Sequence, residues 1–248
     1  MYHGRLEDGK PARPILEPVR ANRYIDSRDQ LARSELHASM TGKNRTETRA
    51  HGVRVLFSRH SEVQRLKQEH RPVIHGTRAW DVSWLLMDYI GRCRIKPRSH
   101  VLDVGCGWGI LGIYCAKRHG ARVTAVDKDP EVFPFVRLHA RINRVRVTPL
   151  RADFDGVSVR RLNDVDVLVG SDICFWDSMV DPLRRLILRA VRTGVRTVLI
   201  SDPGRSPFGR LVEHFERRGM GRAFEWSTGR PRKIRGEILR VDGGTNWL

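Results

Sequence analysis

Two kinds of hydrophobic pattern alternate along the chain from about residue 100 onward. Short runs of consecutive apolar residues are typical of strands buried on both faces, and apolar residues recurring every three or four positions are typical of amphipathic helices. The pattern predicts strands at 100–104, 122–126, 145–148, 165–170 and 196–201, and helices at 110–119, 131–143, 180–191 and 208–218. Such alternation predicts a parallel sheet with helices on both faces.

The flanks of this region extend the pattern. Two more strands, 223–227 and 234–241, follow each other without a helix, which predicts an antiparallel hairpin at the edge of the sheet. A helical face precedes the first strand, formed by Val82, Leu85, Leu86, Tyr89 and Ile90. We therefore expect an α/β fold with a Rossmann-like, doubly wound, mostly parallel sheet of seven strands.

The first part of the chain is different: it is polar, rich in Arg and His, and weakly periodic. Helices are predicted at 27–39 and at 61–70, where Ser61 and Gln64 have the spacing of a capping box. The segment 41–52 between them reads as a loop or mobile segment. We interpret residues 1–71 as a partly helical N-terminal extension and residues 72–248 as the main domain.

The turn after the first predicted strand carries the clearest chemical signal. Asp103 lies near the strand end, and Gly105, Gly107 and Gly109 follow at every second position. Glycines at such a turn let the backbone approach a ligand where a Cβ would clash. The next strand leads to Asp127, about twenty residues further on, where a carboxylate suits the hydroxyls of a ribose. This pattern predicts a site for a nucleoside-bearing cofactor.

The spacing separates two classes of cofactor. The dinucleotide fingerprint is G-x-G-x-x-G, whereas the third glycine here comes one residue early. Asp103 would repel an anion and favour a cationic ligand. A nicotinamide or flavin site with a degenerate loop remains the alternative. Residues 101–129 resemble motif I of the class I methyltransferases that use S-adenosylmethionine (SAM), and the resemblance implies SAM as the cofactor.

The resemblance also implies a partner for each part of SAM. Asp103 would face the amino-acid end, and Gly105 and Gly107 would lie under the methionine portion and the ribose. Asp127 would accept both ribose hydroxyls, because a carboxylate can take two donors. The other candidate cofactor-binding residues are Trp80, Cys106, Trp108, Gly109, Lys128, Asp153, Phe154 and Ser171. Of these, Asp153 and Phe154 would meet the adenine, although the same stretch has an ordinary turn signal.

The end of the fourth predicted strand is the candidate acceptor site. Ligands of open α/β sheets bind beyond the carboxyl ends of the strands, so residues 171–177 should face the transferred methyl group. Asp172 and Phe175 resemble the acid-x-x-aromatic element of a seven-strand group that modifies mostly protein lysines. Asp172 would hold an amine, and Phe175 and Trp176 would favour a cation and exclude water. The alternative is that both aromatic residues belong to the core.

Two more segments resemble this group. Residues 75–90 resemble the segment before motif I, in which Trp80 would close over the cofactor. Residues 202–205, Asp-Pro-Gly-Arg, resemble an element of methyltransferases that act on the electron transfer flavoprotein β-subunit and of proteins named nicotinamide N-methyltransferases. The tetrapeptide of nucleic-acid amino-methyltransferases and the Pro-Cys of cytosine C5 enzymes are absent. Cys174 lies near the latter position, and we interpret it as a small buried residue.

Composition narrows the class of protein. The net charge of +18 attracts phosphates and acidic protein surfaces, but the arginines are spread along the whole chain. Four cysteines without a metal-ligand spacing predict neither a zinc site nor a disulfide framework. No run is long and apolar enough to span a membrane or to form a signal peptide, so we expect a soluble, cytoplasmic protein.

The sequence thus predicts a SAM-dependent N-methyltransferase whose acceptor is a protein lysine, in a partner with an acidic surface. The alternatives are a small-molecule N-methyltransferase, an RNA methyltransferase that uses the basic surface, and a non-catalytic SAM-binding module. Nucleic acid is the less favoured partner, because the basic residues do not form one run.

Overall fold

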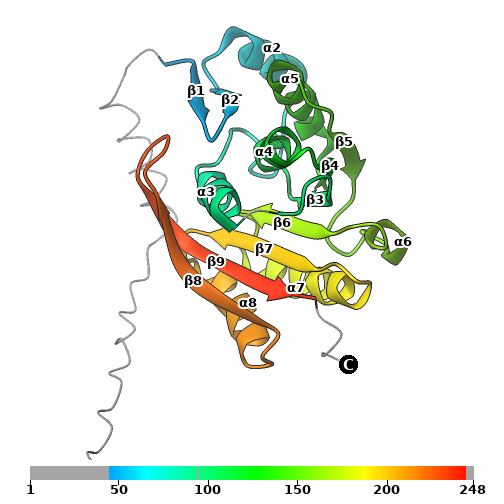
Figure 1. Ribbon diagram of the computed structural model, residues 1–248. Coiled ribbons are helices and arrows are strands. Elements are labelled where there is room, and N and C mark those ends of the chain that lie inside the picture. Colours follow the sequence, from blue (N-terminus) through cyan, green and yellow to red (C-terminus); the bar gives the residue numbers. More distant parts are fainter. Residues whose placement is uncertain (1–44, 94, 244–248) are drawn as a thin grey trace, which may run out of the picture.

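The computed structural model describes residues 45–93 and 95–243 of the 248-residue chain. Its centre is a seven-stranded sheet in the order β5-β4-β3-β6-β7-β9-β8 (Figure 1). The strands are β3 (His100–Val104), β4 (Arg122–Asp127), β5 (Thr148–Arg151), β6 (Val167–Ser171), β7 (Thr197–Asp202), β8 (Gly221–Thr228) and β9 (Ile234–Asp242). The first five run parallel, and β9 is antiparallel to both β7 and β8. The predicted sheet and its edge hairpin are confirmed.

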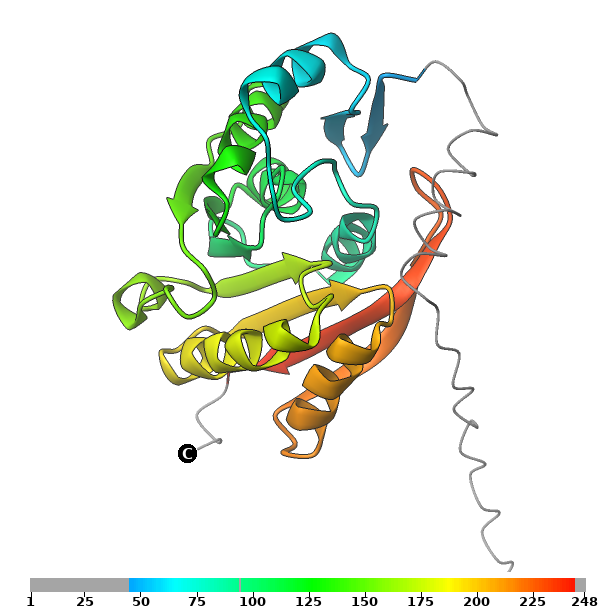
Figure 2. The ribbon, with the colours of Figure 1, turned by 180° about the vertical axis from the view of Figure 1, so that it is seen from behind.

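Helices cover both faces of the sheet (Figures 1 and 2). Successive residues of a strand point to opposite faces, so Val101 packs in one hydrophobic cluster and Leu102 in the other. One face is covered by α3 (Ser83–Cys93), α4 (Ile110–His119) and α5 (Phe133–Asn143), which follows the short 3-10 helix η1 (Pro130–Val132). The other face is covered by α6 (Val159–Leu162), α7 (Asp177–Arg192) and α8 (Ser206–Glu216).

A small hairpin and a helix precede the sheet: β1 (Glu47–Ala50), β2 (Val53–Leu56) and α2 (Ser61–Glu69). The helix confirms the prediction at 61–70. The loop predicted at 41–52 is wrong in its described part, because β1 pairs antiparallel with β2. The N-cap of α2 is also not Ser61: the Nδ1 atom of His60 accepts from the backbone N–H of Glu62 at 3.2 Å.

One predicted strand has different bounds, one helix was not predicted, and one predicted helix lies outside the described residues. The third strand is β5 at 148–151 instead of 145–148, and α6 has no predicted counterpart. The helix predicted at 27–39 lies outside the described part of the chain. The division at residue 71 stays a prediction, although β2 and α2 pack on α4 and α5 of the main sheet. Among the described helices, none has the length and apolar composition that a membrane span requires.

The parallel strands decide where a site can form. Their carboxyl ends meet at one edge of the sheet, which brings the loops after β3, β4, β5, β6 and β7 together. The sequence predicts polar or glycine-rich residues at each of these loops.

Candidate cofactor and acceptor site

A cavity of about 320 Å³ lies at this carboxyl edge, within the size range of small-molecule sites. Every loop after β3, β4, β5 and β6 contributes to it, and residues before α3 form another wall. Its lining includes Ile74, His75, Gly76, Trp80, Gly105, Gly107, Asp127, Lys128, Asp153, Phe154, Ser171, Asp172, Phe175 and Trp176. The sequence-predicted cofactor and acceptor residues therefore largely meet in one place.

The glycine-rich turn after β3 forms the floor of this cavity. Gly105 has φ +60°, and a Cβ there would come within 2.6 Å of the Ile173 side chain. Gly107 has φ +51°, and apart from its own residue and its two chain neighbours no atom lies within 4 Å of where its Cβ would be. The first glycine is thus required by packing, and the second leaves open space on the cavity side, as a ligand that approaches the backbone needs.

Asp127 ties β4 to this turn. Its Oδ2 atom accepts from the backbone N–H of Gly107 at 3.0 Å, and its Oδ1 atom accepts from that of Asp129 at 3.0 Å. Burial raises the pKa of Asp127, and these backbone hydrogen bonds oppose that shift. Each oxygen has a second lone pair, so the carboxylate can still accept hydroxyl donors from the cavity.

Asp103 has a different position from the one expected. It is 2% exposed and does not line the cavity, and its Oδ2 atom accepts from the backbone N–H of Gly112 at 2.9 Å. Burial raises its pKa to about 8, so the side chain does not offer a full negative charge near pH 7. The expectation that Asp103 faces the amino-acid end of the ligand is therefore corrected: it anchors the start of α4.

Three other predicted cofactor residues lie behind the cavity wall. Cys106, Trp108 and Gly109 do not line the cavity. The Trp108 ring is 2% exposed and stacks on Phe135 with ring centroids 5.0 Å apart. Gly109 is the N-cap of α4, with φ +71°. These residues shape the turn from beneath instead of facing a ligand.

The segment at 74–76 forms a roof over the cavity and is held by two indoles. Trp80 Nε1 donates to the His75 carbonyl at 2.7 Å, and Trp108 Nε1 donates to the Gly76 carbonyl at 2.8 Å. His75 has φ +47°, a left-handed conformation that a non-glycine residue rarely adopts. Because Trp108 belongs to the glycine-rich turn, roof and floor are directly connected.

Aromatic rings gather beneath this roof. The His75 ring lies 4.5 Å from Phe175 and 5.4 Å from Trp176 by ring centroids, and Phe175 and Trp176 lie 4.7 Å apart. Trp176 is 51% exposed, so it is not a core residue. Partial burial lowers the pKa of His75, and Arg205 and Arg78 add to this while Asp172 opposes it. The imidazole is therefore mainly neutral near pH 7.

An ion pair joins the ends of β6 and β7. Asp172 has φ +61° and a side chain that is 6% exposed, and it pairs with Arg205. Arg205 also donates from Nη1 to Asp202 Oδ2 at 2.9 Å. Burial raises the pKa of Asp202 to about 6, and Arg205 opposes this shift. Asp172 thus reaches the cavity as a carboxylate with one cation already beside it.

Sequence reasoning did not assign Arg205 to the site. The Asp-Pro-Gly-Arg turn resembles a family element, and the resemblance by itself gives Arg205 no role. The position of Arg205 shortly after β7 does indicate that it lies near the site, because the carboxyl ends of neighbouring parallel strands lie side by side. His75 was likewise noted only within a motif, since nothing local shows that the segment before α3 returns to the cavity.

The other predicted cofactor residues also line the cavity: Lys128, Asp153, Phe154 and Ser171. Asp153 is exposed, and its Oδ1 atom accepts from the Gly156 N–H at 2.6 Å, which is the turn that the sequence also allowed. Ser171 accepts from the Ser201 hydroxyl at 3.0 Å. Cys174, by contrast, is fully buried, and burial raises its pKa to about 12, which argues against a thiolate nucleophile.

Comparisons with known proteins agree with this geometry. A family model described as "Methyltransferase domain" matches residues 101–194. A ubiquinone biosynthesis O-methyltransferase of Xanthomonas campestris is 31% identical over 124 residues, which are 49% of this chain and 50% of that protein. An electron transfer flavoprotein beta subunit lysine methyltransferase of Danio rerio is 28% identical over 173 residues, 68% of this chain and 64% of that protein. The chain thus covers only half to under two thirds of these two relatives.

Solved structures extend the likeness to the fold. A precorrin-6y C5,15-methyltransferase of Geobacter metallireducens superposes with a TM-score of 0.52 at 15% identity, over 71% of this chain and 95% of that one. The family match over residues 101–194, the strand order and the glycine-rich turn after β3 together support a methyltransferase domain of the class I, seven-strand, SAM-dependent kind.

Proposed function

We propose that the protein transfers the methyl group of SAM to the side-chain amine of a lysine in a protein. One observation carries the proposal: Asp172, Phe175 and Trp176 line the same cavity as Gly107 and Asp127. The residues proposed to bind the acceptor and those proposed to bind the cofactor line one cavity, which supports the proposal. The likeness to the lysine methyltransferases of the electron transfer flavoprotein supports this choice of acceptor.

The cavity residues fit SAM in both size and polarity. The open space above Gly107 and the free lone pairs of Asp127 would take the ribose, and Asp153 and Phe154 would meet the adenine. SAM supplies an electrophilic methyl group on a sulfonium. The protein's task is accordingly to bind, to align the acceptor and to exclude water.

The acceptor amine must reach the methyl group without its proton. Asp172 would accept a hydrogen bond from the amine and orient its lone pair, while Phe175 and Trp176 would keep water away. Arg205 pairs with both Asp172 and Asp202, so the charge of Asp172 is partly compensated before an amine arrives, which limits the extra stabilisation of an ammonium ion. Burial in this aromatic pocket further favours the neutral amine.

Methylation of a small-molecule hydroxyl is a second candidate. It is favoured by the likeness to the ubiquinone biosynthesis O-methyltransferase and by the neutral His75 imidazole on the cavity, which could accept a proton from a hydroxyl. The two candidates differ in where the methyl group ends. With a lysine acceptor the methyl group stays with the precipitated protein. With a small-molecule acceptor it is extracted with the small molecules.

Incubation of a cell lysate with deuterated SAM tests the proposal. We expect mass spectrometry to find the deuterated methyl group on lysine side chains when the wild-type protein is added. We expect the Asp172→Asn variant to bind SAM normally and to transfer more slowly, with Asp164→Asn, on the opposite edge of the sheet, as a matched control. Label confined to small molecules would overturn the lysine proposal and support the second candidate.

A further inference from the structure

The β8–β9 hairpin is longer than the parallel strands beside it. β9 pairs with β7 as far as Glu237, which faces Asp202 at the carboxyl end of β7. The hairpin then continues on its own to the pair Thr228 and Ile234. The cavity lies at the carboxyl ends of the parallel strands, so the hairpin tip projects past the edge that carries the cavity (Figure 1).

This tip is strongly basic. Residues 229–233 read Gly-Arg-Pro-Arg-Lys, and Arg230 and Lys233 are exposed. Neither forms an ion pair with any residue that the structure describes. The tip contacts the rest of the fold at two points: the Arg230 carbonyl lies 3.1 Å from His51 Nε2, and Arg232 pairs with Asp81.

The tip is linked to the cavity through the residues before α3. Asp81 follows Trp80, which lines the cavity, and the Arg78 guanidinium lies 4.2 Å from the centre of the Trp80 ring. Arg78 is also close enough to Arg232 to lower its pKa, although burial is the larger cause. We call Arg78, Arg230, Arg232 and Lys233 the basic rim. Within the basic rim, Arg232 pairs with Asp81.

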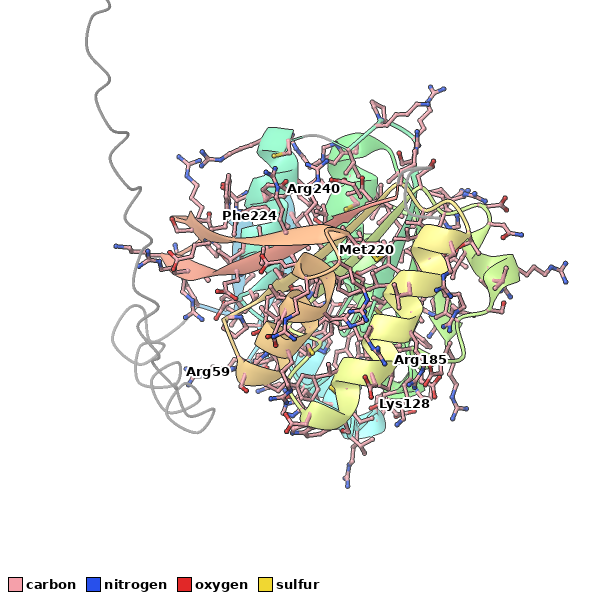
Figure 3. All side chains as sticks on the ribbon, turned by 90° about the horizontal axis from the view of Figure 1, so that it is seen from below. Arg59, Lys128, Arg185, Met220, Phe224 and Arg240 are labelled. Atoms are coloured by element: carbon pink, nitrogen blue, oxygen red, sulfur yellow. The ribbon has the colours of Figure 1, made fainter. Side chains whose placement is uncertain are left out.

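Arginines on the other side of the cavity are already neutralised. Arg185 pairs with Asp155, and Arg210 pairs with Asp177. Elsewhere basic side chains are spread around the molecule, as Arg59, Arg185 and Arg240 illustrate (Figure 3). The positive charge next to the cavity is thus concentrated at the hairpin tip, apart from Lys128, which lines the cavity at the end of β4. A short group of carboxylates matches such a patch better than an RNA strand, which needs a groove that follows many phosphates.

We propose that the basic rim docks an acidic segment next to the acceptor lysine of the substrate protein. This inference rests on the proposed function, since it names what surrounds the lysine that enters the cavity. Carboxylates between the guanidinium groups would relieve their mutual repulsion and form charge-assisted hydrogen bonds. The rim would thereby select lysines in acidic surroundings and orient them toward Asp172.

Binding of a short fluorescein-labelled peptide, with one lysine flanked by glutamates, tests the proposal by fluorescence anisotropy. We expect the double variant Arg230→Gln, Lys233→Gln to bind it roughly fivefold more weakly than the wild type, and the difference to shrink as salt is added. The matched control, Arg160→Gln with Arg161→Gln, removes the same charge from two exposed residues of α6. These residues line a different cavity, at the opposite edge of the sheet. The control variant should bind like the wild type.

Calorimetry with S-adenosylhomocysteine checks that each variant is folded. If both double variants lost peptide affinity equally, the loss would come from the lower net charge and not from a particular site. That result would overturn the docking site. The wild type could also bind a single-stranded RNA more tightly than the peptide, with the same two substitutions at the tip weakening RNA binding. That result would overturn the proposal that the partner is an acidic protein segment. Peptide binding as expected without methylated lysine in the lysate would leave the docking site standing and contradict the proposed function.

Discussion

At the scale of single residues, Asp127 is the side chain on which the cofactor site depends most. It holds the N–H groups of Gly107 and Asp129 and faces the cavity with its remaining lone pairs. The same carboxylate therefore shapes the turn and would bind the ligand. A change here should affect binding more than a change at any other acid of the cavity.

We predict that Asp127→Asn weakens the binding of S-adenosylhomocysteine by at least tenfold. An amide has one oxygen where the carboxylate has two, and hydrogen bonds to charged groups contribute about 1.5–3 kcal/mol. Isothermal titration calorimetry measures the affinity, and Asp164→Asn is the control. An unchanged dissociation constant would refute the assignment of Asp127 to the ribose.

Asp103 gives a prediction about pH. Its pKa is about 8 in the folded protein and near 3.8 in the unfolded chain. Between these values the folded protein keeps a proton that the unfolded chain releases, so this residue lowers the free energy of unfolding as the pH rises. We predict that Asp103→Asn removes this fall, up to about 1.4 kcal/mol per pH unit, and leaves S-adenosylhomocysteine affinity within about twofold.

Urea unfolding at several pH values between 4 and 8 measures the difference between wild type and variant. Other titrating groups, such as His139 and Asp202, are present in both proteins, so their contributions cancel to first approximation. Parallel curves for the two proteins would show that Asp103 is ionised in the folded state and would contradict its raised pKa.

The sequence predicted which residues meet at the cavity better than it predicted their orientation. Asp127, Asp153 and Asp172 each follow a strand, and strand ends converge in this architecture. Asp103 lies inside its strand, where alternation decides the face, and its side chain points to α4 instead of the cavity. Arg205 follows β7 and pairs with Asp172 after the neighbouring strand β6, so the contact depends on the order of strands in the sheet.

At the scale of elements, one asparagine attaches the β1–β2 hairpin to the rest of the fold. Asn143 Nδ2 donates to the Arg54 carbonyl at 2.7 Å, and Asn143 Oδ1 accepts from the Arg54 N–H at 2.8 Å. A single side-chain amide thus pairs with both backbone groups on the open edge of β2, as a third strand would. His139 adds a further bond, with Nε2 accepting from the Leu56 N–H at 3.2 Å.

We predict that Asn143→Ala lowers the free energy of unfolding by about 2–3 kcal/mol. The substitution leaves a part-buried N–H and a part-buried carbonyl of Arg54 without their partner. Asn163→Ala, at the exposed C-terminal end of α6, is the control and should change stability by no more than about 0.5 kcal/mol. Equal effects of the two substitutions would show that the hairpin does not depend on Asn143.

Elements with strong periodicity were predicted well, and those set by tertiary contacts were not. α4 agrees residue for residue, because an apolar run begins after a glycine and ends at another. β1 has only four residues and little apolar character, so it forms through its pairing with β2, whose other edge bonds to Asn143 on α5. β5 begins three residues later than predicted, because Pro149 and Leu150 pair with β4 although Val145 and Val147 look more strand-like.

At the scale of the whole molecule, charge is the dominant feature. Lys and Arg number 46 and Asp and Glu number 28, so many cations have no acid to pair with. Self-repulsion of this excess destabilises the compact state. Surface ion pairs such as Arg235 with Glu225 are weakened by salt, but each contributes little.

We predict that the melting temperature rises by a few degrees between about 20 and 300 mM sodium chloride. Added salt screens the repulsion among exposed cations over the relevant distances. Circular dichroism at a fixed protein concentration measures the transition. A melting temperature that falls with salt would mean that the ion pairs outweigh the repulsion.

The roof of the cavity has a consequence for observing the protein. Three of its six tryptophans report on this region: Trp80 and Trp176 line the cavity, and Trp108 holds the roof to the glycine-rich turn. Their ultraviolet emission depends on nearby polarity and on the indole hydrogen bonds. Binding of a ligand in the cavity should therefore change the intrinsic tryptophan fluorescence, so that binding can be followed without a label.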